Sequence, residues 1–569
     1  MEARRIPLDR LTWSRWRAAV ASFATSEVGG RAKALFAALL ALLLAINALN
    51  VVNSYVGRDF MTAIEARSMS RFVAKAILYV SVFGAATVAA VIYRFTEERL
   101  ALLWREWLTR RLVARYLEGG AYYWLREQPD VSNPDQRIAD DVRTFTTTTL
   151  SLGLVALNTT FTIIAFSGVM WSISPLLFVT AVLYAAGGSV LTVLFGRPLI
   201  WLNYDQADRE ASFRADLVHL RERAESVVVL RREGRLGERL QRRVTDLVGN
   251  MKRIVAANRN LGFFTTGYNY LIQIIPIVIV APLFIRGEAQ FGVISQSSMA
   301  FSHLIGAFSL IITQFQQISS YAVVLARLSG LAESVEGVAA ARGASAIAID
   351  ETADTLGWKD LTLRSPHDGT VLVRALTLAV APGTRVLVTG PNEAASTALF
   401  RATVGVWSEG AGIVARPPPD AIQFVPERPY LPPGPLRQTL VRTGSDARVG
   451  DAQIRDVLGA LGVANVVERA EGLDVERDWD GLLSLGEQQR LALARVLLAR
   501  PRYVVLDRPA TVLGDEEIAA VLAMLAKSGI TAVTFADDAR LAASHDVVLE
   551  LAEDGTWTCS PTPKETTAR

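Results

Sequence analysis

One segment in the second half of the chain has residue types and spacing that suit phosphate chemistry. A short apolar run leads into residues 390–397 (GPNEAAST), placed like the phosphate-binding pattern G-x-x-x-x-G-K-[ST]. Such a loop needs glycines, so that backbone N–H groups close on phosphates, and a lysine to neutralise them. Gly390 is present, and Thr397 stands at the magnesium-binding hydroxyl position. Ala395 and Ser396 replace the second glycine and the lysine, so the loop alone is a weak signal.

A second segment, 483–490 (LSLGEQQR), precedes a leucine-rich helical stretch and the strand Tyr503–Asp507. This combination resembles the signature of ATP-binding-cassette (ABC) transporters and the strand that follows it. The resemblance implies that two cassettes pair head to tail, each ATP lying between one chain's phosphate loop and the other chain's signature. It assigns Gly390, Asn392, Ser396, Thr397 and Asp507 to the chain's own site, with Thr397 and Asp507 as magnesium ligands, and Ser484, Gly486 and Gln488 to the partner's site.

The chain's own site departs from the family pattern. Glu427 replaces the glutamine of the glutamine loop, Arg508 stands where the catalytic carboxylate is expected, and Asp537 replaces the switch histidine. A general base must be a carboxylate or histidine beside the attacking water, and arginine accepts no proton at neutral pH. No catalytic residue is therefore intact. We expect ATP and Mg²⁺ at a partner-completed site, and at its own site either unhydrolysed nucleotide or none.

The elements ahead of these motifs are charge-free apolar segments. Hydrophobic residues make up 51% of the 569 residues and charged residues 20%. A membrane span needs about 20 mostly apolar residues. The charge-free windows predict six spans and a turn at residues 171–175 (WSISP), where proline and small polar residues favour a corner. These spans lie near 34–55, 73–93, 147–170, 175–196, 262–285 and 298–325.

Basic residues are strongly asymmetric between alternate loops. Segments 1–33, 94–144 and 199–260 together hold 29 Lys and Arg, and segments 53–72 and 286–297 hold 4. Cytoplasmic loops carry the excess, so both termini are predicted to be cytoplasmic, in a bacterial inner or plasma membrane. The net charge of +3 does not favour nucleic acid as a partner, and Cys559 is the single cysteine, so intrachain disulfides are excluded.

The predicted fold is an α-helical transmembrane domain of six spans with an exporter-like arrangement, fused to an α/β P-loop-type ABC cassette. Residues 133–141 (NPDQRIADD) and 220–225 (LRERAE) resemble inner-loop motifs of the branch that holds peroxisomal acyl-CoA half-transporters and SbmA/BacA-like permeases. The expected divisions are an interfacial segment (1–32), a permease domain (33–333), a linker (334–348), a degenerate cassette (349–556) and a polar tail (557–569).

Polar residues recur at helical spacing in three of the spans. Such stripes either join helices or line a wet cavity, and three together favour a cavity for peptide-like or other bulky solutes. The candidate lining is Ser302, Ser309, Thr313, Gln316, Asn269, Gln273 and Asn158. The leading prediction is the non-hydrolytic half of a heterodimeric transporter in contact with lipid. The alternatives are a homodimeric ion-gradient-driven transporter and a non-transporting scaffold or regulator.

Overall fold

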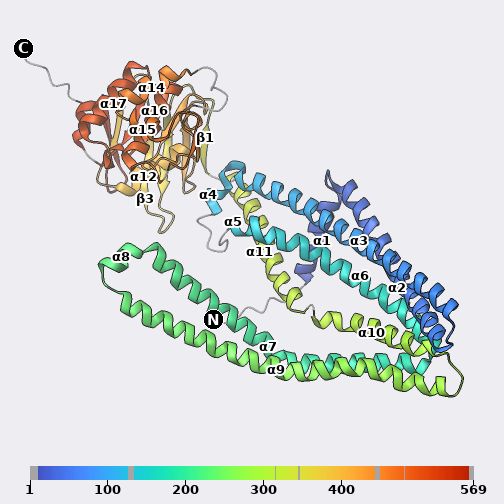
Figure 1. The fold of residues 1–569 in the computed structure, drawn as a ribbon. Helices are drawn as coiled ribbons and strands as arrows, with labels where there is room; N and C mark the ends of the chain where they lie inside the picture. The colour runs from blue at the N-terminus through green and yellow to red at the C-terminus, as the bar shows by residue number, and fades with distance from the viewer. Residues whose placement is uncertain are drawn as a thin grey trace, which may run out of the picture. The chain divides into compact units, whose positions relative to one another are not determined.

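The computed structural model describes residues 10–125, 134–313, 315–343, 346–441, 449–479, 481–537 and 539–562. The chain forms two compact units that meet in sequence at Val338 and Ala339 (Figure 1). The first unit is helical and the second is an α/β unit. This division agrees with the two halves expected from composition, and each unit is described by itself.

The first unit is built from long helices. Its elements are α1 (Arg10–Ala24), α2 (Gly29–Glu65), α3 (Met69–Leu117), η1 (Glu118–Gly120), α4 (Ala121–Leu125), α5 (Pro134–Gln136), η2 (Arg137–Asp141), α6 (Val142–Ile173), α7 (Pro175–Glu222), α8 (Ala224–Val229), α9 (Glu233–Ile285), α10 (Gly292–Thr313) and α11 (Phe315–Gly343). Within the described residues, five helices are long and apolar enough to cross a membrane, namely those that contain α2, α3, α6, α7 and α9. They coincide with the first five predicted spans. The sixth, 298–325, falls on the end of α10 and the start of α11.

Three of these helices are much longer than a membrane is thick. Helices α3, α7 and α9 contain 49, 48 and 53 residues, whereas about 20 residues cross the hydrocarbon layer. Helix α3 continues without a break from its apolar part through the charged segment 93–117. Segment 205–255 is also helical, but the short helix α8 turns the chain between α7 and α9. Figure 1 shows α7 and α9 side by side over most of their length.

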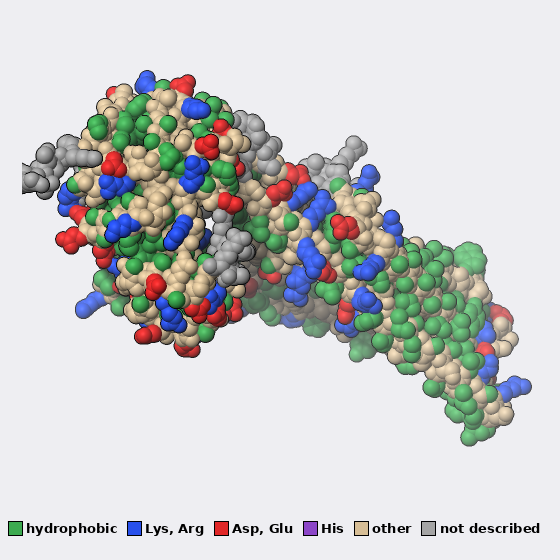
Figure 2. All heavy atoms as spheres, turned by 90° about the horizontal axis from the view of Figure 1, so that it is seen from above, with side chains coloured by type: hydrophobic (Ala, Val, Ile, Leu, Met, Phe, Trp, Pro, Cys, Tyr) green, Lys and Arg blue, Asp and Glu red, His purple; other side chains and the backbone are tan. Residues whose placement is uncertain are grey.

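The predicted corner between the third and fourth spans is confirmed. Helix α6 ends at Ile173, Ser174 adopts an extended conformation, and Pro175 is the first residue of α7. A proline is well placed there because the first turn of a helix has no internal partner for its N–H groups. On the surface of this unit, hydrophobic side chains cover one continuous stretch, and charged side chains gather outside it (Figure 2).

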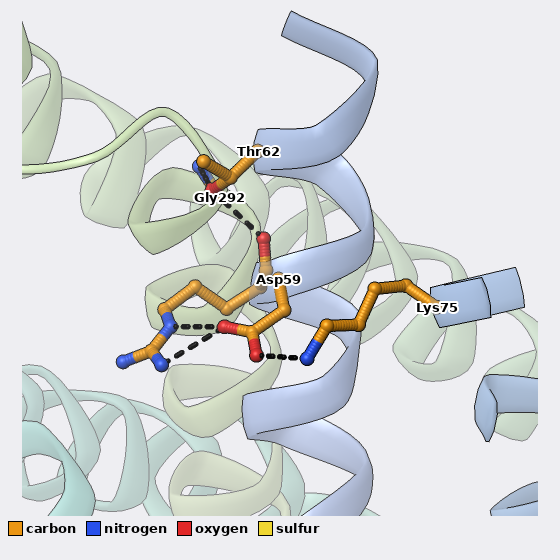
Figure 3. A network of polar contacts seen from close by, with 5 residues as sticks. Asp59, Thr62, Lys75 and Gly292 are labelled. Atoms are coloured by element: carbon orange, nitrogen blue, oxygen red, sulfur yellow. Dashed lines mark hydrogen bonds and ion pairs between the residues drawn. The ribbon is translucent and has the colours of Figure 1, made fainter. Parts of the chain in front are cut away.

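Polar contacts join the end of α2 to the start of α3 and to the start of α10. The carboxylate of Asp59 accepts hydrogen bonds from Arg58 and from Lys75, the latter at 2.9 Å (Figure 3). The backbone N–H of Gly292 donates to Thr62 Oγ1 at 3.1 Å. A Cβ on Gly292 would come within 1.8 Å of the Arg58 carbonyl oxygen, so only glycine allows α10 to begin this close to α2.

The end of α1 packs against protein. The ring of Phe23 in α1 is buried and stacks on Trp104 of α3 with ring centroids 4.9 Å apart. The ring of Trp107, also in α3, lies with its centroid 5.6 Å from that of Phe23. The described part of the predicted interfacial segment 1–32 consists of α1, the turn after it and the start of α2. Phe23, at the end of α1, packs on aromatic rings of the protein instead of facing lipid.

The second unit contains two main sheets. A four-stranded sheet has the order β1 (Ile347–Asp350), β5 (Gly410–Ala415), β2 (Gly357–Arg364), β3 (Val371–Ala379). A six-stranded sheet has the order β12 (Trp557–Pro561), β11 (Val547–Leu551), β4 (Val386–Thr389), β10 (Thr531–Phe535), β9 (Tyr503–Asp507), β6 (Ile422–Val425). Strands β7 (Gly434–Pro435) and β8 (Glu476–Arg477) form a small ribbon. The helical elements are α12 (Glu393–Val404), α13 (Leu436–Leu440), α14 (Asp451–Ala460), α15 (Asn465–Arg469), α16 (Leu485–Ala499), η4 (Pro509–Thr511), α17 (Asp515–Lys527) and η5 (Ala539–Ser544).

Side-chain alternation in the six-stranded sheet separates two cores. Val504 and Leu506 pack with the apolar side of α16, whereas Tyr503 and Val505 pack with the apolar side of α12. Successive residues of a strand point to opposite faces. The two helices that follow the phosphate loop and the signature therefore cover opposite faces of one sheet.

Two of the expected divisions, the linker and the polar tail, contain regular secondary structure. Helix α11 continues to Gly343, through most of the segment 334–348 that composition suggests as a linker. Alanine has the highest helix propensity, so the alanine-rich segment extends the helix. The predicted polar tail begins with β12, which pairs antiparallel with β11 through Leu549 and Cys559. Residues 563–569 of that tail lie outside the described residues.

Candidate nucleotide site

The phosphate-loop segment lies between β4 and α12, as predicted, but its helix is capped from within. The side chain of Asn392 accepts a hydrogen bond from the backbone N–H of Ala395 at 3.0 Å, and Glu393 is the first residue of the helix. Gly390 has φ 142°, and a Cβ there would come within 2.1 Å of the Leu551 carbonyl oxygen. The amide oxygen of Asn392 thus takes a backbone donor that a phosphate would use.

Arg508 brings three of the predicted positions together. Its Nη2 donates a hydrogen bond to Thr397 Oγ1 at 3.3 Å, and its Nε lies 3.5 Å from Oδ2 of Asp537. Its backbone is left-handed, with φ 45° and ψ 51°, and its N–H donates to the Phe535 carbonyl at 2.8 Å. The guanidinium therefore connects the start of α12 with the segment that follows β10. The Arg508 guanidinium thus lies beside the Thr397 hydroxyl, which was predicted to bind magnesium.

Asp507, at the end of β9, is the second predicted magnesium ligand. Burial raises the pKa of its carboxyl, while the neighbouring Arg508 and the backbone N–H of Glu427 act in the opposite direction. Ser396, at the lysine position, is buried and supplies no positive charge. Positive charge reaches this site from Arg508, which directly follows strand β9, and from Arg401 of α12, since both lower the pKa of Asp507.

The segment around Glu427 is held by a residue whose role the sequence analysis missed. Nε2 of Gln489 in α16 donates to the carbonyl oxygens of Pro426 and Glu427, at 3.2 and 2.6 Å. Gln489 is buried, so these bonds tie the loop after β6 directly to the helix after the signature. The sequence signal is the pair of adjacent glutamines in LSLGEQQR, of which Gln489 is buried and Gln488 is partly exposed.

The signature segment has an ordered, self-contained start. Ser484 caps α16, because its Oγ accepts from the N–H of Glu487 and the Glu487 carboxylate accepts from the N–H of Ser484. The S-x-x-E spacing is the sequence signal for such a capping box. Arg469 forms an ion pair with Glu487, and Nε2 of Gln488 donates to the Leu483 carbonyl at 3.2 Å. Ser484 itself is exposed, so the signature is presented on the surface.

A Cβ on Gly486 would lie 3.4 Å from the side chain of Val512. A Cβ at this position would therefore be in contact with the segment that follows Arg508.

Some residues of the predicted cavity lining join helices, and others are exposed. The side chains of Asn158 and Thr162 in α6 both hydrogen bond to buried Asn47 of α2, at 2.9 Å each, so this stripe joins helices. Asn269 and Gln273 of α9 are exposed in the described structure. The hydroxyl of exposed Ser302 donates to the carbonyl of Ser298 in the same helix. The side chains of Ser309, Thr313 and Gln316 lie outside those that the structure describes.

Comparisons with known proteins agree with both units. Residues 22–285 match the family described as ABC transporter transmembrane region 2, and residues 373–511 match the family described as ABC transporter. An uncharacterized ABC transporter ATP-binding protein of Synechocystis is 34% identical over 537 residues, covering 93% of this chain and 81% of that protein. The chloroplastic ABC transporter D family member 2 of Arabidopsis thaliana is 32% identical, covering 95% and 86%. The human lysosomal cobalamin transporter ABCD4 is 26% identical, covering 82% of each chain.

These matches confirm the predicted family in its coarser form. The likeness to SbmA/BacA-like permeases stays a prediction. Proteins of this type are dimers that handle small-molecule substrates, and the cassette implies the use of ATP and Mg²⁺. The chain belongs to the ABC transporter family, as an integral membrane half-transporter of the D-family type with a transmembrane region fused to an ABC cassette.

Proposed function

We propose that this chain is the non-hydrolytic half of a heterodimeric ABC transporter. In this proposal it moves a bulky polar solute across a bacterial inner or plasma membrane with both termini in the cytoplasm. The observation that carries the proposal is the position of the Arg508 guanidinium against Thr397 Oγ1 and the Asp537 carboxylate. The chain's own site then holds a cation where hydrolysis needs a base.

The charges at this site oppose Mg²⁺. A magnesium ion demands close oxygen ligands in octahedral geometry and usually keeps several waters. Here the Thr397 hydroxyl accepts from a guanidinium, and the same Arg508 places a positive charge beside the Asp507 carboxylate. The residues present therefore do not fit a bound Mg²⁺ with Arg508 in this position.

The signature supports the other part of the proposal. Ser484 is exposed and its capping box with Glu487 is complete, so the segment is ready to contact a nucleotide held by another chain. Hydrolysis of ATP with Mg²⁺ would take place at the site that this signature and the partner's phosphate loop form together. The partner must then supply the lysine and the catalytic carboxylate.

The test is ATP turnover by the purified chain alone and by the chain with a hydrolytic half-transporter. We expect no turnover by the chain alone, turnover by the pair, and loss of that turnover after Ser484→Arg in this chain. The matched control is Ser528→Arg, the same substitution at an exposed residue at the end of α17. Turnover by the chain alone, or turnover of the pair that survives Ser484→Arg, would contradict the proposal.

A bulky polar substrate is supported by the exposed polar side chains of α9 and by one relative. The human protein is named a lysosomal cobalamin transporter, and cobalamin is a large polar solute. Uptake by cells that express the pair is measured with labelled cobalamin and short peptides. Asn269→Leu together with Gln273→Leu should reduce uptake without reducing the amount of protein in the membrane.

Two alternatives remain distinguishable by the source of energy. A secondary transporter would stop when an ionophore collapses the ion gradient and would continue when ATP is depleted. A scaffold or regulator would give no uptake under either condition. Uptake that follows ATP alone agrees only with the leading proposal.

A further inference from the structure

A cavity of about 900 Å³ lies where α1, α2 and α3 meet. Its lining includes three arginines, namely Arg31 from the first turn of α2 and Arg110 and Arg111 from α3. Trp107 also lines it, and the Arg111 guanidinium lies 5.3 Å from the centre of that ring. None of the residues that line this cavity belongs to the nucleotide site or to the polar stripes of the spans.

Two of these arginines have no carboxylate partner in the part of the chain that the structure describes. Arg110 forms an ion pair with Glu106 at 2.7 Å, and the remaining lining carboxylate is Glu27. No ion pair joins Arg31 or Arg111 to any described residue, and both are exposed. A cavity with two unpaired guanidinium groups favours an anionic ligand.

The helix that begins here adds to the positive potential. Val28 precedes α2 and has no side-chain group that could cap the helix, so the first backbone N–H groups of this 37-residue helix lack a side-chain acceptor. The hydroxyls of Ser22, Thr25 and Ser26 instead donate to carbonyl oxygens of α1. The arginines, rather than these hydroxyls, must therefore supply the donors to a ligand.

The cavity lies at the end of the membrane-spanning part of α2. The charge-free stretch of α2 starts at Ala34, three residues after Arg31. Along α3, the apolar side chains of Leu102, Phe95 and Val91 are 59–63% exposed and lead away from the cavity. Basic pockets between helices at the cytoplasmic border bind anionic lipid headgroups, and tryptophan is enriched at that depth.

We infer that this cavity binds the phosphate headgroup of an anionic phospholipid, with the acyl chains along the exposed apolar side of α3. Arg31 and Arg111 contact the phosphate, and Trp107 lies at the level of the glycerol. The lipid would tie α1 to the α2–α3 pair on the basic side of the membrane. A free phosphate would satisfy the arginines but would leave the exposed apolar side chains of α3 unused.

The test uses the full chain in nanodiscs of phosphatidylcholine with increasing phosphatidylglycerol, and retained phosphatidylglycerol is counted by native mass spectrometry. Each arginine near an anionic surface contributes about 1 kcal/mol, or about fivefold in affinity. Arg31→Gln with Arg111→Gln should therefore weaken retention about 30-fold. Arg31→Lys with Arg111→Lys should keep most of it. Thermal unfolding in pure phosphatidylcholine checks that the variants fold.

The matched control is Arg105→Gln with Arg143→Gln. Both residues are exposed, lie on the same basic side, and are outside the cavity lining. An equal loss in this control would overturn the inference in favour of general surface attraction. Equal retention of phosphatidylglycerol by wild type and the glutamine variant would also overturn it. Displacement of the lipid by millimolar glycerol phosphate would show a site for soluble anions instead.

Discussion

Replacing Arg508 with asparagine is the most direct perturbation of the candidate nucleotide site. The change removes the guanidinium that contacts Thr397 and Asp537. Asparagine tolerates the left-handed backbone conformation, here φ 45° and ψ 51°, better than most residues. The variant therefore reports on the lost charge, whereas Arg508→Ala would add backbone strain. We expect Arg508→Asn to destabilise the cassette slightly and measurably.

The size of the effect follows from the distance and the exposure of the pair. Two unit charges 3.5 Å apart attract by about 1.2 kcal/mol at a dielectric constant of about 80 and by about 5 kcal/mol at about 20. The Arg508 and Asp537 side chains are 23% and 47% exposed, so the measured value should fall near the exposed-pair range of about 0.2–1 kcal/mol. About 1 kcal/mol corresponds to about 2–4 °C in the unfolding midpoint of a unit of this size.

The assay is thermal unfolding of the purified full chain, with the cassette transition followed at low salt and at 1 M salt. Arg508→Asn and Asp537→Asn should each lower the midpoint, and the double variant should be no worse than the stronger single one. The difference should shrink in 1 M salt, where the screening length is about 3 Å. Arg502→Asn is the control, since its partner Asp354 is 96% exposed at 3.7 Å. Additive effects of Arg508→Asn and Asp537→Asn would refute the contact.

Three further predictions concern other groups. Burial raises the pKa of Asp507, so ionisation of this carboxyl destabilises the folded state as the pH rises through that pKa. Asp507→Asn should therefore raise the unfolding midpoint at pH 7.5, and this gain should become smaller on acidification. Burial lowers the pKa of His545 below its usual 6.5, so the folded state binds fewer protons than the unfolded state. The unfolding midpoint should therefore fall as the pH drops below about 6.5, and it should fall less in His545→Gln. Buried Asn47 bonds to Asn158 and Thr162, so Asn47→Ala should lower the stability of the membrane unit by about 0.6–1.7 kcal/mol, measured by unfolding in detergent.

The division of the chain and the position of its motifs are predictable from sequence because they rest on local patterns. Charge-free windows identify the membrane helices, and Pro175 marks the corner between two of them. Segment 483–490 is predicted to precede a helix, and α16 does begin within it, at Leu485. Each of these signals depends on residues within a few positions of one another.

The contacts that define the candidate site depend on residues far apart in the chain. Nothing near Arg508 in sequence indicates that its guanidinium contacts Thr397, 111 positions earlier. The pairing of Asn158 with Asn47, also 111 positions apart, likewise turns a predicted cavity residue into a contact between helices. The two units meet inside the predicted linker 334–348, but its helical conformation as far as Gly343 was not predictable, because composition alone does not separate a flexible alanine-rich segment from the end of a helix.

The length of α9 has a mechanical consequence. At 1.5 Å per residue, its 53 residues extend about 80 Å, of which about 30 Å suffices to cross the hydrocarbon layer. Pro276 and Pro282 lie near one end of this helix, where each removes a backbone hydrogen bond and makes bending easier. A tilt of about 5° at Pro276 displaces Glu233, about 65 Å away along the helix, by about 6 Å. Bending at these prolines would therefore move the far half of α9 together with α7, which packs beside it.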